Sequence, residues 1–168
     1  MLSLYNTLSR CKEPLAVGSN GSFGMYTCGP TVYRDAHIGN LRSYLMADWI
    51  RRILLFDNID VTHIKNITDV GHMRQEMLEQ GEDKVVAAAR AEGKSAADIA
   101  DFYTQRFIDD ELSININPAT KLPKATAHVK EMIDIAVDLV SNGLAYEVDG
   151  NVYFAVQKFP SYGELSGN

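Results

Sequence analysis

The chain has 168 residues and a formal net charge of −6, from 16 Lys plus Arg against 22 Asp plus Glu. Hydrophobic residues make up 46% and charged residues 23%, an ordinary globular composition that excludes collagen-like, coiled-coil and disordered chains. This length allows one domain or one and a half, and it can bury a core without disulfides or structural metals. No apolar run approaches the roughly 18 residues of a membrane-spanning helix, and the start does not resemble a secretory signal. A cytoplasmic location is therefore expected.

The negative charge is concentrated in the second half of the chain. Residues 1–80 carry 8 basic and 8 acidic side chains, whereas residues 81–168 carry 8 basic and 14 acidic ones, so that 8 − 14 = −6. An anionic substrate is tolerated best by the neutral first half, where backbone amides or a helix N-terminus can supply positive potential.

A strand, a loop and a helix are predicted in succession near the start. Residues 23–28, FGMYTC, are rich in β-formers and predict a buried strand. From Asn40 onward, apolar residues recur every three or four positions, which predicts a helix of about four turns. Residues 60–65, DVTHIK, predict a second strand, so the order implies a right-handed parallel crossover and an α/β sheet. The predicted apolar face of the helix consists of Leu41, Leu45, Trp49, Ile53 and Phe56.

The second half predicts helices separated by a polar connection. Ser95 and Asp98 have the spacing of a capping box, and the helix that they open is expected to run to about Leu112. Residues 113–123 contain two prolines and form the best domain boundary in the sequence.

A helix and a hairpin are expected to follow this connection. Residues 125–140 are strongly amphipathic and are stopped by Gly143, a residue that readily adopts the left-handed conformation of a helix end. Asp149-Gly150-Asn151 then predicts a hairpin turn between two short strands, 145–148 and 152–156.

The loop between the first strand and its helix carries the best candidate site. It contains Cys28-Gly29-Pro30-Thr31-Val32-Tyr33 and then His37-Ile38-Gly39-Asn40 directly before the helix. In an open α/β sheet, ligands bind beyond the carboxyl ends of the strands, and the free amides of a helix N-terminus attract phosphate. His37 and Asn40 can donate hydrogen bonds to that phosphate, and Gly39 lets a planar group approach the backbone. In the alternative interpretation, His37 caps the helix and Gly39 relieves crowding.

The motifs CGPTVY, HIGN and NITD, in this order, resemble the first half of a cysteinyl-tRNA synthetase, a class I aminoacyl-tRNA synthetase. The similarity extends along the whole chain through LYNTLSR, GEDK, EGKSAADIADFYTQRFIDD, PKAT and YGELS. HIGN departs from the usual HIGH signature at Asn40, which can donate to phosphate but carries no positive charge. The resemblance therefore implies an ATP site with an altered pH dependence.

The fold that the resemblance implies is α/β, with a Rossmann-like parallel sheet. Residues 1–115 would form the first half of a class I, HIGH-type nucleotide-binding domain, and residues 116–168 would form part of an inserted α/β connective domain.

The activity that the resemblance implies is a two-step ligation. Cysteine attacks ATP, supplied with Mg²⁺, to give cysteinyl-adenylate, and the cysteinyl group then passes to tRNA(Cys). Enzymes of this kind act mainly by positioning and by stabilising phosphate charge. By resemblance, the catalytic residues are His37 and Asn40, the ATP-binding residues are His37, Gly39 and Asn40, and the residues of the amino-acid pocket are Gly29, Thr31 and Thr68.

Cys28 matches the first ligand of the zinc ion of this family. Zinc suits cysteine recognition, because it binds the substrate sulfur and disfavours the hydroxyl of serine. The other family ligands lie beyond residue 168. His63 and His72 offer imidazoles, but each is expected to be structural, and a buried free thiol is the alternative for Cys28.

The second catalytic signature of the family, the KMSKS loop, does not occur in this sequence. The chain is therefore expected to be a fragment of a longer synthetase that binds ATP weakly and does not aminoacylate tRNA efficiently. Two alternatives remain open. One is a free-standing paralogue that adenylates cysteine or ligates it to a small molecule, and the other is a non-catalytic nucleotide-binding module.

Overall fold

The structure is a computed structural model that describes residues 2–18, 21–70 and 84–167. Contacts within the chain divide it into two units, one of residues 17–127 and one of residues 1–16 with 128–168. Each unit is considered separately below. No helix in the described ranges is both long enough and apolar enough to cross a membrane.

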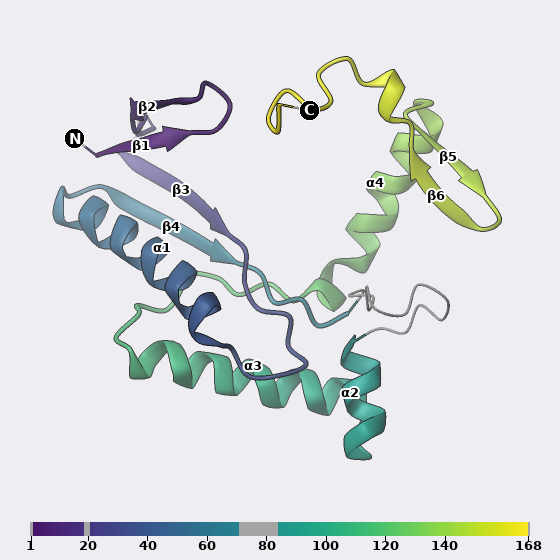
Figure 1. Ribbon diagram of the computed structural model, residues 1–168, viewed down its shortest axis with the longest axis horizontal. Coiled ribbons are helices and arrows are strands. Elements are labelled where there is room, and N and C mark those ends of the chain that lie inside the picture. The colour runs from purple at the N-terminus through teal and green to yellow at the C-terminus, as the bar shows by residue number, and fades with distance from the viewer. Residues whose placement is uncertain (1, 19–20, 71–83, 168) are drawn as a thin grey trace. The chain divides into compact units, whose positions relative to one another are not determined.

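A parallel strand pair with a helical crossover forms the centre of the first unit (Figure 1). Strand β3 (Ser22–Thr27) pairs with β4 (Asp60–Lys65), and helix α1 (Ile38–Phe56) connects them and packs against β4. The predicted α/β arrangement is confirmed, and β4 occupies the predicted residues. Strand β3 ends one residue earlier than predicted, at Thr27, and it is half-exposed instead of buried. The reason is that β4 is its only paired strand in the described part of the chain.

The polar connection after residue 113 extends this sheet on the other side of β4. The amide of Lys65 donates to the carbonyl of Lys121 at 3.1 Å, and the amide of Ile67 donates to the carbonyl of Pro123 at 2.8 Å. Both bridges are parallel. The residues up to 127 thus belong by contact to the first unit, and the assignment of 116–168 to a separate connective domain stays a prediction.

Helix α1 was predicted correctly, but its predicted buried face is wrong. The helix buries Tyr44 and Asp48, whereas Trp49 is 58% exposed and Phe56 is 86% exposed. Leu41 and Leu45 of the predicted stripe do pack against the core. Non-local contacts to β4 and to the third helix select the buried side, and these contacts outweigh the apolar periodicity of the helix itself.

Two further helices lie in the described part of the first unit. Helix α2 (Lys84–Glu92) packs against α3 (Ala96–Ser113). The predicted capping box at the start of α3 is confirmed, because Ser95 Oγ accepts from the amide of Asp98 at 3.1 Å while the Asp98 carboxylate accepts from the amide of Ser95 at 3.3 Å. The buried cluster of this unit consists of Val32, Tyr44, Ile67, Ala89, Ile99, Ala100, Phe107 and Ile116.

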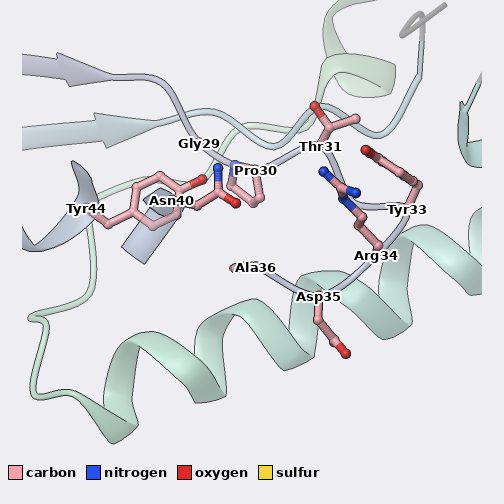
Figure 2. A pocket seen from close by; sticks show the side chains of 9 residues that line it. All are labelled: Gly29, Pro30, Thr31, Tyr33, Arg34, Asp35, Ala36, Asn40 and Tyr44. Carbon is pink, nitrogen blue, oxygen red and sulfur yellow. The ribbon is translucent and has the colours of Figure 1, made fainter. Parts of the chain in front are cut away.

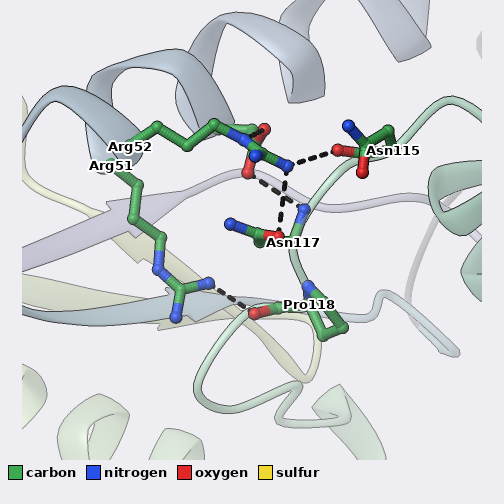
Figure 3. Close-up of polar contacts among 6 residues, drawn as sticks. Arg51, Arg52, Asn115, Asn117 and Pro118 are labelled. Carbon is green, nitrogen blue, oxygen red and sulfur yellow. Dashed lines mark hydrogen bonds and ion pairs between the residues drawn. The ribbon is translucent and has the colours of Figure 1, made fainter. Parts of the chain in front are cut away.

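Polar side chains of α1 hold the segment that follows α3 (Figure 3). Arg51 Nη1 donates to the carbonyl of Pro118 at 2.5 Å, and Arg52 Nη2 donates to Asn117 Oδ1 at 3.1 Å. Asp48 is buried, accepts from the amide of Asn117 at 3.0 Å and forms an ion pair with Arg52 at 2.5 Å. The contacts to Asn117 and Pro118 join residues more than sixty positions apart in the sequence.

The second unit contains a hairpin at each end of the chain. Strands β1 (Ser3–Asn6) and β2 (Cys11–Pro14) pair antiparallel, a hairpin that the sequence analysis did not predict. Strands β5 (Ala145–Val148) and β6 (Asn151–Phe154) form the predicted hairpin. Its turn has positive φ at both central residues, Asp149 and Gly150, as a tight hairpin requires.

Helix α4 (Val129–Ser141) lies between these hairpins in the sequence. The predicted helix from residue 125 starts as a 3₁₀ turn, Ala125–His128, and becomes α-helical only at Val129. Gly143 adopts a φ of 70° just after the helix, which confirms the predicted stop. A short 3₁₀ turn, Val156–Lys158, follows β6.

Candidate functional site

Residues 28–37 leave the carboxyl end of β3 and lead into α1. Asn66, directly after β4, fastens this loop: its Oδ1 accepts from the amide of Gly29 and from the hydroxyl of Tyr26, both at 3.0 Å. Its Nδ2 donates to Thr68 Oγ1 at 3.1 Å, and the amide of Thr68 donates to the carbonyl of Pro30 at 3.0 Å. The carboxyl ends of the two strands therefore meet at one edge, where α/β folds bind ligands.

Gly29 is required by the close approach of two backbones. A Cβ atom at this position would lie 1.7 Å from the carbonyl oxygen of Asn66. Any side chain would push the loop away from the residues that follow β4, so the glycine allows the two segments to touch.

A cavity of about 270 Å³ opens beside this loop (Figure 2). This volume is close to the lower end of the range for small-ligand pockets. Three of the predicted site residues, Gly29, Thr31 and Asn40, line it, whereas His37, Gly39, Cys28 and Thr68 do not. Its lining consists of Gly29, Pro30, Thr31, Tyr33, Arg34, Asp35, Ala36, Asn40 and Tyr44.

His37 and Asn40 form a capping box at the N-terminus of α1. His37 Nδ1 accepts from the amide of Gly39 at 3.1 Å, and Asn40 Oδ1 accepts from the amide of His37 at 3.2 Å. The alternative drawn from the sequence, in which His37 caps the helix, is thus what the structure shows in this state. The acceptor atoms of both side chains thus receive hydrogen bonds from amides at the start of the helix. The Asn40 side chain also lines the cavity.

Cys28 is exposed and unpaired, so the alternative of a buried thiol is wrong. Among the residues that the structure describes, no three His, Cys, Asp or Glu side chains gather as metal ligands. His72 lies outside the described residues. The described donor set does not fit a zinc site, and the role of Cys28 as one zinc ligand stays a prediction.

His63 is buried within β4, as a structural residue should be. Its Nε2 lies 2.8 Å from Thr27 Oγ1. Burial, reinforced by the positive charges of Lys65 and Arg51, lowers the pKa of His63 to about 4. The imidazole is therefore neutral near pH 7, and it serves the packing of the strands.

A buried ion pair that the sequence analysis missed lies beneath the cavity. Lys65 and Glu111 are both buried and in direct contact, and the Lys65 ammonium lies 4.9 Å from the ring centroid of Tyr44. Burial raises the pKa of Tyr44 to about 12, and electrostatic interactions with Cys28 and Glu111 add to this shift. Burial also raises the pKa of Glu111, against the opposing effect of Lys65. One signal could have found Tyr44: it follows Asn40 by four positions and so shares its helix face.

The model of the family described as "tRNA synthetases class I (C) catalytic domain" matches residues 14–168. The chain belongs to this family. The cysteine–tRNA ligase of Treponema denticola is 46% identical over 98% of this chain and 33% of its own length, and that of Desulfitobacterium hafniense is 44% identical over 99% of this chain and 32% of its own length. This class I synthetase domain thus spans about a third of the length of the curated relatives that it matches.

Solved structures agree on the fold. Methionyl-tRNA synthetase of Mycobacterium tuberculosis, in complex with methionyl-adenylate, superposes on 79% of this class I synthetase domain with a TM-score of 0.60 at 18% identity, and 28% of that chain is covered. The Rossmann-like α/β fold predicted from the sequence is confirmed.

Proposed function

We propose that this chain carries the ATP- and amino-acid-binding half of a cysteine–tRNA ligase site. The parent reaction activates cysteine with ATP and Mg²⁺ to cysteinyl-adenylate and transfers the cysteinyl group to tRNA(Cys). One observation carries the proposal. The predicted residues Gly29, Thr31 and Asn40 line one cavity at the carboxyl end of the parallel strands, in a chain that is 40–46% identical to proteins named cysteine–tRNA ligase. Because tRNA charging accompanies translation, the proposal includes the cytoplasm as the place of action.

The N-terminus of α1 is the proposed position of the triphosphate. A helix of 19 residues presents a partial positive charge at its start, where the amide of Gly39 is capped by the His37 side chain. A phosphate that binds there would take over the amides now capped by His37 and Asn40, and it would leave both side chains free to donate to its oxygens. Gly39 would leave room for the adenine or ribose. The catalytic contribution of these groups is to hold and neutralise phosphate charge in line with the attacking carboxylate.

The loop that follows β3 is the proposed position of cysteine. Gly29 and Thr31 line the cavity, and Thr68 is tied to it through Pro30 and Asn66. No step is assigned to zinc, since the described residues supply only Cys28.

A second candidate is a nucleotide-binding module without catalysis. The capping box favours it, because His37 and Asn40 already serve the helix. A free-standing paralogue that adenylates cysteine would use the same cavity, and it would differ by turning over without tRNA.

The test measures binding of ATP with Mg²⁺ by calorimetry and cysteine-dependent exchange of pyrophosphate into ATP. We expect ATP binding, weakened about ten-fold by Asn40→Ala through loss of a charge-assisted hydrogen bond. Asn151→Ala, on the exposed β5–β6 hairpin, is the matched control. ATP binding without cysteine-dependent exchange would favour the module, and exchange without any tRNA requirement for turnover would favour the paralogue. Absence of ATP binding would contradict all three.

A further inference from the structure

The buried ion pair Lys65–Glu111 has no part in the activation chemistry proposed above. Lys65 is the last residue of β4 and has no exposed surface, and Glu111, on α3, is 4% exposed. Charged groups are rarely buried this deeply unless they are paired, because water solvates them far better than protein does. The pair therefore fixes the end of β4 against α3 at one defined position.

Two aromatic rings complete the surroundings of the ammonium group. Its nitrogen lies 4.9 Å from the ring centroid of Tyr44 and 5.5 Å from that of Phe107, within cation–π range. The rings of Tyr44 and Phe107 pack edge to face, with their centroids 5.2 Å apart. The ring of Tyr44 is thus held by the cation and by Phe107, and its orientation depends on both contacts.

The phenol group of Tyr44 ends in the cavity. Tyr44 is 6% exposed and lines the cavity together with Gly29, Thr31 and Asn40. Figure 2 shows its oxygen directed away from α1, toward the loop of Gly29 and Pro30. No side chain or backbone group in the described part of the chain hydrogen bonds to this hydroxyl. The phenol oxygen is not one of the fully buried atoms without a partner, so it is open to the cavity, where a ligand oxygen would accept its hydrogen bond.

We propose that the Tyr44 hydroxyl donates a hydrogen bond to the carboxylate oxygen of the amino-acid substrate, which remains as the acyl oxygen of the adenylate. Lys65 and Glu111 are positioning residues that act through the ring of Tyr44. The assignment to the amino-acid end rests on the proposed function, since Gly29 and Thr31 line the same cavity. The phosphates would bind at the N-terminus of α1, which precedes Tyr44 by about one helical turn.

The first experiment separates the aminoacyl end from the nucleotide. Calorimetry measures the affinity of the full chain for a sulfamoyl analogue of cysteinyl-adenylate and for ATP with Mg²⁺. Tyr44→Phe keeps the ring and removes the hydroxyl, so the analogue should bind about five-fold more weakly while the affinity for ATP stays unchanged. Tyr5→Phe, in the exposed β1 strand, is the matched control and should change neither affinity.

The second experiment tests positioning through non-additivity. Lys65→Met alone would strand a buried carboxylate, so the pair is replaced together by Lys65→Met with Glu111→Leu, which keeps volume and leaves no buried charge. We expect this double variant to keep its helical circular dichroism and to bind the analogue more weakly. When Tyr44→Phe is added to this double variant, the affinity for the analogue should fall by less than a further two-fold. The reason is that the Tyr44 ring is already free of its cation–π contact in the double variant.

Each outcome decides between the proposals. The role of Tyr44 would be overturned if Tyr44→Phe left the affinity for the analogue unchanged, or if it lowered the affinity for ATP equally. In either case, binding of both probes by the wild-type chain would leave the proposed function standing. Fully additive losses would overturn the positioning role alone. A wild-type chain that binds neither probe would overturn the role of Tyr44 and the proposed function together.

Discussion

The contacts inside one unit of this chain differ from those inside the other in the sequence separation that they span. In residues 17–127, contacts join distant segments: the amide of Gly29 to Asn66, and Lys65 to Glu111. In residues 1–16 and 128–168, hydrogen bonds span shorter separations, such as the fifteen positions between Lys158 Nζ and the carbonyl of Gly143. Among the described residues of that unit only Ala145 is buried. The cavity lies where the long-range contacts converge, so the geometry of the site and the stability of the first unit depend on the same residues.

The largest effect is expected from Gly29→Ala. The new methyl group would overlap the carbonyl oxygen of Asn66, and backbone atoms cannot move aside as a flexible side chain can. We expect a loss of about 3 kcal/mol or more in the free energy of unfolding, at the upper end of overpacking effects. ATP binding should be lost with it, because the loop and the residues after β4 separate. Chemical denaturation and calorimetry measure the two losses.

Gly24→Ala is the matched control, since a Cβ atom at this position of β3 meets nothing within 4 Å. It should leave both quantities nearly unchanged. Similar behaviour of the two variants would contradict the close approach of Gly29 and Asn66.

A smaller effect is expected from the protonation of His63. Its folded pKa of about 4 lies below the ordinary value of about 6.5, so the neutral imidazole contributes stability that is complete above pH 6.5. That contribution is lost as the pH falls from 6.5 through 4. Between pH 7 and pH 4 the wild type should lose about 2 to 3 kcal/mol more than His63→Gln, as measured by denaturant unfolding at each pH.

Asn151→Gln, at an exposed position of the β5–β6 hairpin, provides a control without a titrating side chain. It should keep the wild-type pH dependence. If His63→Gln kept it as well, another group would have to account for the loss at low pH.

Local signals in the sequence predicted the elements well. The β-rich run 60–65 became β4, Ser95 and Asp98 formed their capping box, and Asp149-Gly150 formed the hairpin turn. In each case the decisive interactions lie within a few residues, so composition and spacing are sufficient to reveal them.

Non-local contacts account for what the sequence did not reveal. The exposure of Trp49 and Phe56 and the burial of Asp48 depend on which elements cover α1, and the pairing of Lys65 with Glu111 spans forty-six positions. Of the site, the motif residues Gly29, Thr31 and Asn40 were predicted and share a cavity. Tyr44 was not predicted: its spacing of four positions from Asn40 indicates a shared helix face, but its place in the cavity lining is set by the fold.

The smallest effect is expected in the second unit, and it tests the comparison directly. Ile99 on α3 has no exposed surface, whereas Ile135 on α4 is 61% exposed. The same substitution at both sites changes helix propensity equally, so the difference measures burial. Ile99→Ala should cost about 2 to 5 kcal/mol in the free energy of unfolding, and Ile135→Ala less than about 0.5 kcal/mol. A loss at Ile135 as large as that at Ile99 would mean that the apolar face of α4 is covered in solution, and sedimentation at the same protein concentration would show whether a second copy covers it.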